Sequence, residues 1–423
     1  MAPVTLDLAR RAIIDPTSLP FLTPPDTARW AKAVELLTTL GALDDTGAAT
    51  DLGRRMAKLP VHPRLARMIV DARHPWLACV IAAVLDERDV LRGRPADLPV
   101  ELAERVRLVT DPDAHHEAAD GRALRTVRDR ARQLARRADV EPGLGPHDVN
   151  LTALGATLAP GFPDRIARRI GATRGGFVTA DGQTLSIDRG EAIHEAAGIV
   201  AVDIDARSKR GAVHRATALE AKLDHLVYAT PDLADTVARI RDEWGVTPTP
   251  GGSHDGMGTA NALLAIGNGA YLEIIGPDPS QPDHVGPRPF GVDDVTEPRL
   301  ITWAAAVPDL DLWLAWCTAR KLDPGPAFAM QRTTPTGDVL HWRLTLPPGD
   351  GDGVVPFLIE WPGATPATTA AAGVELFSFE LSHPDLAVAG RLQEYALPYP
   401  VTRSAASLRA VVLTPAGMVT LES

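Results

Sequence analysis

The stretch LDHLVYATPDL at residues 223–233 decides the fold of the second half of this 423-residue chain. It joins an apolar run, typical of a buried strand, to Pro-Asp-Leu, after which a helical pattern begins. The same order recurs in ITWAAAVPDL at residues 301–310 and in LFSFELSHPDL at residues 376–386, so that the three prolines are 77 and 76 residues apart. Because strand, Pro-Asp-Leu and helix keep a constant spacing, they indicate an internal repeat.

The repeating unit contains more than one strand. After each of the first two helices come apolar runs that predict further strands, at residues 261–266, 270–275, 340–346 and 355–361. The unit is therefore predicted as βαβββ, twice in full over residues 221–370. A third, partial βαββ unit is predicted over residues 371–423.

Paired βαβββ units resemble the vicinal oxygen chelate superfamily, and within it this chain is most similar to a glyoxalase-like domain. The resemblance covers about residues 222–423. It is carried by LDHLV at residues 223–227, GGSHDGMGTAN at residues 251–261 and YLEII at residues 271–275. It implies two modules that enclose a cavity for a divalent metal and a substrate.

By this resemblance, His225 and Glu273 lie where the superfamily keeps metal ligands, and Glu360 is the counterpart of Glu273 in the second module. Imidazole and carboxylate ligands suit Fe, Mn, Zn, Ni or Co without selecting among them. Such an ion would act as a Lewis acid toward two adjacent substrate oxygens. The repeat places Thr302 and Ser378, both poor ligands, at the positions that correspond to His225. A site without metal therefore stays open as the alternative.

A glycine-rich loop adds a second group of candidate residues. His254 lies among glycines that let the backbone approach a ligand closely, and imidazole titrates near neutral pH. We expect His254 to move a proton or to donate a hydrogen bond to substrate, with Glu360 as a second catalytic candidate. Thr259 and Asn261 would orient an oxygen of the substrate. The alternative for these side chains is a structural role in their own strand or loop.

The first half of the chain is predicted to be mostly helical before it changes to short strands. An amphipathic helix is expected over residues 28–40, and Thr50 is placed to cap a short helix that stops at Pro60. The fold class is therefore α+β with several domains. They are a winged-helix and helical-bundle region at residues 1–142, a small OB-like β-barrel at residues 143–220 and the βαβββ modules.

The run LGRRMAKLPVHPRLARM at residues 52–68, with FPDRIARR at residues 162–169, resembles bacterial DEAH-box helicases of the HrpB type. The resemblance covers residues 5–218 and implies the winged helix, helical bundle and small barrel that accompany the motor. A motor needs a Walker A loop, which contains a Gly-Lys pair, and no Gly-Lys pair occurs in the sequence. We therefore expect this chain by itself to have no ATPase activity and not to be an active helicase.

Arginines recur every three or four positions between residues 122 and 137, which places them on one helix face. Such a stripe would follow the phosphates of RNA or DNA, because neutralising phosphates releases counterions. The predicted nucleic-acid residues are Arg122, Arg125, Arg128 and Arg132. The alternative is a solvated helix face, partly neutralised by neighbouring aspartates.

The formal net charge of −11 is unevenly distributed. Residues 1–220 carry 31 Lys and Arg against 30 Asp and Glu, whereas residues 221–423 carry 12 against 24. The excess of acid therefore does not argue against RNA binding by the first half. The sequence has no apolar run of membrane-spanning length, no signal-peptide pattern and two distant cysteines. We expect a cytoplasmic protein with no membrane partner.

These patterns predict a fusion of a motor-less, helicase-derived region with a glyoxalase-like barrel. The first functional hypothesis is a metal-assisted isomerase, lyase or dioxygenase that acts on a small oxygenated metabolite. The second is a nucleic-acid-binding accessory protein whose barrel binds a small ligand without metal.

Overall fold

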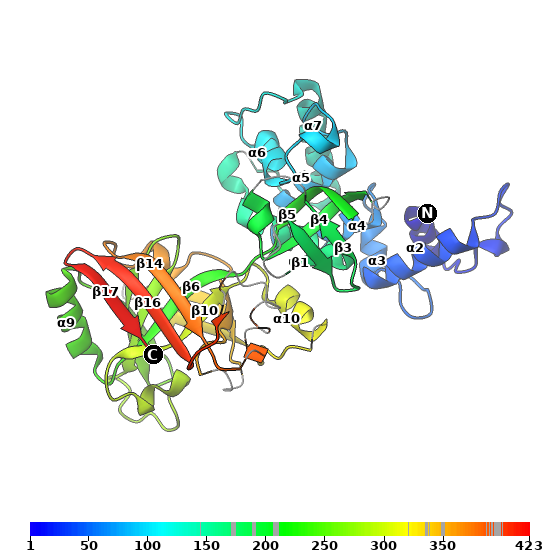
Figure 1. Ribbon diagram of the computed structural model, residues 1–423. Coiled ribbons are helices and arrows are strands. Elements are labelled where there is room, and N and C mark those ends of the chain that lie inside the picture. The colour runs from blue at the N-terminus through cyan, green and yellow to red at the C-terminus, as the bar shows by residue number, and fades with distance from the viewer. Residues whose placement is uncertain are drawn as a thin grey trace. The chain divides into compact units, whose positions relative to one another are not determined.

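The computed structural model describes two compact units, Met1–Leu219 and Glu220–Ser423 (Figure 1). Helices and strands occur in both, which confirms the α+β class expected from the sequence. No helix among the described residues combines the length and the apolarity needed to cross a bilayer. The description covers residues 1–423 except 144, 171–174, 188–191, 206–210, 320, 335–336, 338, 348–351, 386, 389, 391, 393–398 and 400.

Helices make up most of the regular secondary structure of the first unit. The α-helices are α1 (Ala2–Arg10), α2 (Thr27–Thr39), α3 (Asp51–Met56), α4 (Pro63–Ile69), α5 (Pro75–Asp86), α6 (Ala103–Thr110), α7 (Gly121–Ala138) and α8 (Leu154–Leu158). Short 3₁₀ helices lie between them or near the barrel: η1 (Pro16–Ser18), η2 (Pro95–Asp97), η3 (Pro146–Asp148), η4 (Leu151–Ala153), η5 (Ala159–Gly161), η6 (Pro163–Arg165) and η7 (Ala192–Glu195).

Helix α5 forms the core of this helical region, because every residue from Leu77 to Val84 is buried. Its apolar residues cover all faces, as expected of a helix that other helices surround. Helices α6 and α7 pack against it. The predicted cap of α3 is confirmed, since Thr50 Oγ1 accepts a hydrogen bond of 2.9 Å from the amide of Gly53. A Cβ at Gly53 would lie 2.1 Å from the carbonyl oxygen of Ala42, so this close approach requires glycine.

The first unit ends in a small barrel, as the short predicted strands indicated. Its strands are β1 (Ile166–Arg169), β2 (Gly176–Thr179), β3 (Thr184–Ser186), β4 (Gly198–Asp205) and β5 (Gly211–Ala218). They close in the order β1-β2-β3-β5-β4. Phe177, Leu185 and Ile199 fill the interior with other buried apolar residues.

An eight-stranded sheet forms the centre of the second unit, in the order β11-β12-β13-β10-β6-β9-β8-β7. The first half holds β6 (Lys222–Ala229), α9 (Leu233–Trp244), β7 (Thr249–His254), β8 (Thr259–Ala265) and β9 (Tyr271–Pro277). The second half holds β10 (Arg299–Ala306), α10 (Leu310–Ala319), β11 (Ala327–Thr333), β12 (Val339–Thr345) and β13 (Phe357–Glu360). Each half is one βαβββ module, as predicted. The modules meet where β6 and β10 pair antiparallel, and η8 (Pro289–Asp294) links them.

The third repeat forms a separate four-stranded sheet in the order β15-β14-β16-β17. After η9 (Pro366–Thr368) come β14 (Glu375–Ser382), β15 (Val401–Thr402), β16 (Ser407–Thr414) and β17 (Gly417–Glu422). The indole of Trp303 on β10 packs edge-on against the rings of Phe379 and Tyr399, each at 5.3 Å between centroids. This packing joins the two sheets. Leu386, the last residue of the third Pro-Asp-Leu, lies outside the described residues.

Candidate functional site

A cavity of about 170 Å³ lies in the second unit, between strands of the two βαβββ modules. Strands β8 and β11 are far apart in the sheet order, yet Nη1 of Arg332 on β11 lies 2.7 Å from Oδ1 of Asn261 on β8. The sheet must therefore curl until its two ends approach each other. The cavity residues on which the site depends are His225, His254, Asn261, Tyr271, Glu273, Phe290, Phe328, Met330, Arg332, Trp342, Leu344, Leu346, Phe357, Ile359 and Trp361.

Strand alternation decides which side chains enter this cavity. On β9, Tyr271 and Glu273 are two residues apart and both line it. Phe357 and Ile359 on β13 line it, as does Trp361 just after the strand, and Glu360 lies between Ile359 and Trp361. Glu360 thus points away, and its Oε2 lies 3.4 Å from a guanidinium nitrogen of Arg343. The structure does not bring Glu360 together with the other candidate metal and catalytic residues.

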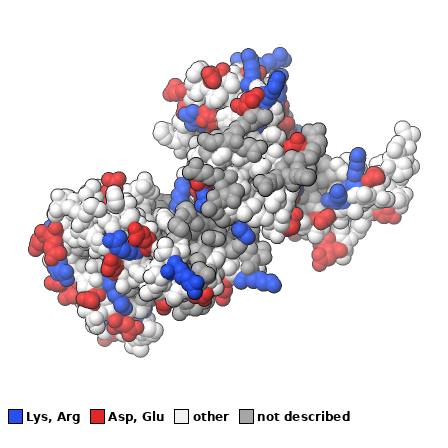
Figure 2. Space-filling model, viewed as in Figure 1, with Lys and Arg blue, Asp and Glu red and all other residues white. Residues whose placement is uncertain are grey.

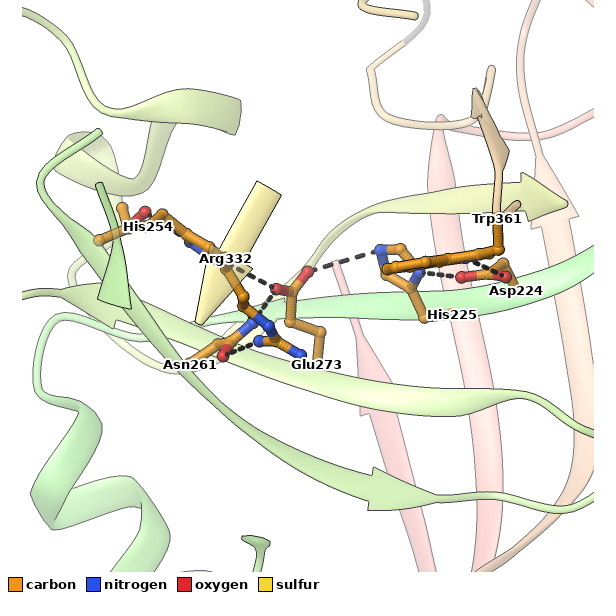
Figure 3. A network of polar contacts seen from close by, with 8 residues as sticks. Asp224, His225, His254, Asn261, Glu273, Arg332 and Trp361 are labelled. Carbon is orange, nitrogen blue, oxygen red and sulfur yellow. Dashed lines mark hydrogen bonds and ion pairs between the residues drawn. The ribbon is translucent and has the colours of Figure 1, made fainter. Parts of the chain in front are cut away.

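His225 lies at the polar end of the cavity, held by a buried carboxylate (Figure 3). Its Nδ1 is 2.7 Å from Oδ1 of Asp224, whose other oxygen accepts a hydrogen bond of 3.0 Å from the indole of Trp361. This carboxylate fixes the orientation of the imidazole. The Nε2 of His225 faces Glu273 Oε2 at 3.4 Å. The ring stacks on Tyr271 with 4.6 Å between centroids.

The carboxylate of Glu273 is the meeting point of the predicted residues. The side-chain amide of Asn261 donates a hydrogen bond to it. His254 approaches the same carboxylate, with 3.8 Å between His254 Nε2 and Glu273 Oε1. Thr259 is buried behind His254, and its Oγ1 lies 2.9 Å from His254 Nδ1. Asn261 and His254 therefore face the cavity, whereas Thr259 positions His254.

Burial and neighbouring charges set the protonation states of this cluster. Burial alone would raise the pKa of Glu273, but the two histidines, the hydrogen bond from Asn261 and the charge of Arg332 hold it below its ordinary value. Burial lowers the pKa of His254; Glu273 opposes this shift and Arg332 adds to it. Glu273 is thus ionised and His254 neutral near pH 7. Burial also raises the pKa of Tyr271 well above its ordinary value.

Strand register shows what the second module contributes at the equivalent positions. On the parallel pair β6–β9, Glu273 lies opposite Val227. The repeat carries Val227 onto Ala304, and on the parallel pair β10–β13 Ala304 lies opposite Phe357. Phe357, not Glu360, is therefore the structural counterpart of Glu273. The correspondence based on sequence was wrong because it ignored which face of β13 each side chain occupies.

The residues present do not fit a resident divalent metal. The second module offers Thr302 and Phe357 where the first offers His225 and Glu273. No three His, Cys, Asp or Glu side chains in the described part of the chain are placed to hold a metal ion. The cluster also contains the guanidinium of Arg332, which repels a second cation.

The predicted nucleic-acid residues on α7 separate into two groups. Arg122, Arg125 and Arg132 are exposed. Figure 2 shows basic side chains gathered over the region where α7 lies, with acidic ones among them. Arg128 instead turns inward and donates hydrogen bonds of 2.8 Å to the carbonyls of Leu108 and Val109, which end α6. Arg128 is therefore a helix cap and not part of the exposed stripe.

Sequence reasoning missed three residues of the cavity cluster. Asp224 could have been found, because it precedes His225 and a carboxylate often orients a functional histidine. Trp361 could have been found from strand alternation, because it lies two residues after Ile359 and four after Phe357, which both line the cavity. Arg332 had no signal in the sequence, because only the curl of the sheet brings β11 next to β8.

The fold of the second unit, with its two βαβββ modules, is similar to that of glyoxalase-like domains. The family model described as a glyoxalase-like domain matches residues 223–396. Within the first unit, the model of the helicase-associated winged-helix domain matches residues 33–61. The chain thus combines a region that matches the glyoxalase-like model with a region similar to the accessory part of HrpB-type helicases.

Individual relatives resemble parts of the chain. The ATP-dependent RNA helicase HrpB of Escherichia coli is 27% identical over 330 residues, which cover 76% of this chain and 36% of that protein. The probable ATP-dependent RNA helicase DHR1 of Saccharomyces cerevisiae is 33% identical over 85 residues, 19% of this chain and 7% of that protein. This chain therefore spans well under two thirds of these relatives.

Solved structures resemble the chain more distantly. The crystal structure of the E. coli DExH-box NTPase HrpB matches with a TM-score of 0.42 and 23% identity, covering 67% of this chain and 31% of that one. A hypothetical protein from Staphylococcus aureus matches with a TM-score of 0.35 and 15% identity, covering 48% of this chain and 85% of that one.

Proposed function

We propose that the glyoxalase-like domain binds a small oxygenated molecule in its cavity without a resident divalent metal. The observation that carries the proposal is the unequal contribution of the two modules. The first supplies the polar residues His225, Asn261 and Glu273, whereas the second supplies an apolar wall that includes Trp342 and Phe357 and one polar residue, Arg332. A ligand with a polar head and an apolar body is complementary to such a cavity.

The polar residues divide the work of holding an oxygen of the ligand. His225, oriented by Asp224, presents Nε2 beside Glu273. Neutral His254 and the amide of Asn261 add hydrogen-bonding groups at the same end. The apolar wall excludes water, which strengthens each of these hydrogen bonds. These four polar side chains are therefore arranged to bind and orient a ligand oxygen and to exchange a proton with it.

Two measurements on the purified full chain test this proposal. Calorimetric titration with 2-acetonaphthone, a neutral aromatic ketone, should show saturable binding. Ile359→Trp, which fills the cavity, should abolish the binding, whereas Phe377→Trp, on a side chain 73% exposed, should leave it unchanged. Elemental analysis after incubation with Fe, Mn, Zn, Ni or Co and gel filtration should show less than stoichiometric metal.

Two results would contradict the proposal. One is the absence of measurable heat with the ketone. The other is one equivalent of a divalent ion that is retained by the wild type and lost in Glu273→Gln. The second result would favour the metal-assisted isomerase, lyase or dioxygenase instead.

We also propose that the first unit binds single-stranded RNA through the exposed arginines of α7. The supporting observation is that Arg122, Arg125 and Arg132 share one exposed face in a unit that contains a helicase-associated winged helix. Fluorescence anisotropy with a labelled oligouridylate should show binding that weakens steeply as salt rises. No binding at about 50 mM salt would rule this role out.

A further inference from the structure

One buried arginine on the cavity wall, Arg332, has no role in the ligand binding proposed above. Arg332 on β11 is 4% exposed and lines the cavity. Its Nη1 donates a hydrogen bond of 2.7 Å to Oδ1 of Asn261 (Figure 3). Its Nε is buried and has no hydrogen-bond partner among the described residues. A guanidinium has five N–H donors, so most of the donor capacity of Arg332 is not used by Asn261.

The neighbouring carboxylate does not pair directly with this cation. Asn261 lies between the two groups, because its Oδ1 accepts from Arg332 while its Nδ2 donates to Glu273. Glu273 in turn faces His225 and His254. No ion pair of Arg332 is found in the described part of the chain. A buried charge without a paired opposite charge is costly, and a bound anion would compensate it.

The local backbone is shaped to leave room for this arrangement. Gly251 on β7 lies against the pair, and a Cβ there would be 2.0 Å from Asn261 Oδ1 and 2.7 Å from Arg332 Nη1. Any other residue at position 251 would displace one of the two side chains. Three strands, β7, β8 and β11, therefore combine to hold the guanidinium on the cavity wall.

Apolar side chains surround the rest of the cavity. Trp342, Phe357 and Ile359 are buried in its wall, and Phe328 and Leu346 are 43% and 39% exposed beside it. The cavity therefore presents one buried cation next to an extensive apolar surface. One fixed cation matches a monoanion better than a phosphate, which carries more charge and needs more donors.

We propose that Arg332 anchors the carboxylate of a small apolar acid and so determines the class of ligand. The inference rests on the proposed function of the cavity. The free N–H groups of the guanidinium bind the carboxylate oxygens in its planar fork. The aromatic or alkyl body of the acid packs against Trp342 and Phe357. Glu273 does not repel the acid strongly, because Asn261 and the two histidines already engage its carboxylate.

The test compares two probes of the same skeleton, 2-naphthoate and the neutral 2-acetonaphthone, by calorimetry on the full chain. Wild type should bind the acid at least tenfold more tightly than the ketone, since a charge-assisted hydrogen bond contributes more than a neutral one. Arg332→Gln should weaken the acid about tenfold or more and change the ketone less than about threefold. Arg332→Lys should recover part of the affinity for the acid.

The matched control is Arg409→Gln, a half-exposed arginine on β16 whose Nε pairs with Glu422 at 3.2 Å. It should change neither affinity. If both probes bind and Arg332→Gln affects them equally, the anchor is wrong while the proposed binding function stands. If neither probe binds the wild type, both proposals fail. If Arg332→Gln does not fold, the wild-type preference decides alone, and equal affinity for acid and ketone overturns the anchor.

Discussion

Two arginines are almost completely buried in the described chain, one in each unit, and their surroundings differ. Arg105 on α6 is 1% exposed. Its Nε lies 3.0 Å from each carboxylate oxygen of Asp89, and its Nη1 donates a hydrogen bond of 2.7 Å to the carbonyl of Pro99. Arg332 is 4% exposed and donates to a neutral amide. The two arginines are therefore similarly buried but have different roles. Arg105 fastens a helix to a loop, whereas Arg332 keeps donors for a molecule that is not part of the chain.

The largest expected loss of stability comes from removing the charge of Asp89, the partner of Arg105. Asp89→Asn leaves the guanidinium of Arg105 buried without a counter-charge, which should lower the stability of the first unit by about 3 to 5 kcal/mol. Urea denaturation followed by hydrogen–deuterium exchange in peptides from α5 to α7 measures this loss. Because the chain has two units, a signal specific to this region is needed.

An exposed ion pair on the neighbouring helix provides the control. Oδ1 of Asp129 lies 3.4 Å from Nη1 of Arg132. The two side chains are 79% and 56% exposed, respectively. Asp129→Asn should change the stability by less than about 0.5 kcal/mol, because water screens such pairs. If both variants cost the same, burial would not explain the role of Arg105.

An intermediate effect is expected for Arg128, which is half-buried and bonded to carbonyls instead of a carboxylate. Arg128→Met removes both hydrogen bonds to the end of α6 and should cost about 2 kcal/mol, measured in the same exchange experiment. Arg125→Met, on the exposed face of the same helix, should cost less than about 0.5 kcal/mol. Equal losses in the two variants would contradict the cap assigned to Arg128.

A smaller change is expected at the second buried arginine. Arg332→Gln removes a charge that no carboxylate pairs directly, and Gln can still donate a hydrogen bond to Asn261. The free energy of unfolding of the second unit should therefore fall by no more than about 1 kcal/mol. Tryptophan fluorescence during urea denaturation, with Trp342 and Trp361 in the cavity wall, provides the measurement. A loss near that of Asp89→Asn would make Arg332 a structural residue and remove the contrast.

The contrast also shows what the sequence could predict. The Pro-Asp-Leu spacing predicted both βαβββ modules, because each repeat is a local pattern of strand, turn and helix. The resemblance to glyoxalase-like domains selected His225 and Glu273, and the glycine-rich loop added His254 and Asn261. All four line the cavity. These residues come from neighbouring strands of one module, so their proximity follows from local topology.

The remainder depends on relations that sequence spacing does not contain. Glu360 was misassigned because one step along a strand moves a side chain to the opposite face. Arg332 was missed because the curl of the whole sheet brings β11 beside β8. Arg128 was grouped with exposed arginines because periodicity identifies a helix face but not the carbonyls at the end of the next helix.

The smallest effect is expected at an arginine on the exposed face of α7. Arg125→Gln removes one positive charge from the α7 stripe and should leave stability unchanged. If the stripe follows a single RNA strand, the slope of log affinity against log salt should fall by about 0.7 for each phosphate that the arginine neutralises in the wild type. Asp129→Asn removes an opposing charge from the same helix and should strengthen binding of the labelled oligouridylate. Opposite signs in the two variants would assign the exposed arginines to RNA, whereas an unchanged slope in Arg125→Gln would leave α7 as a solvated face.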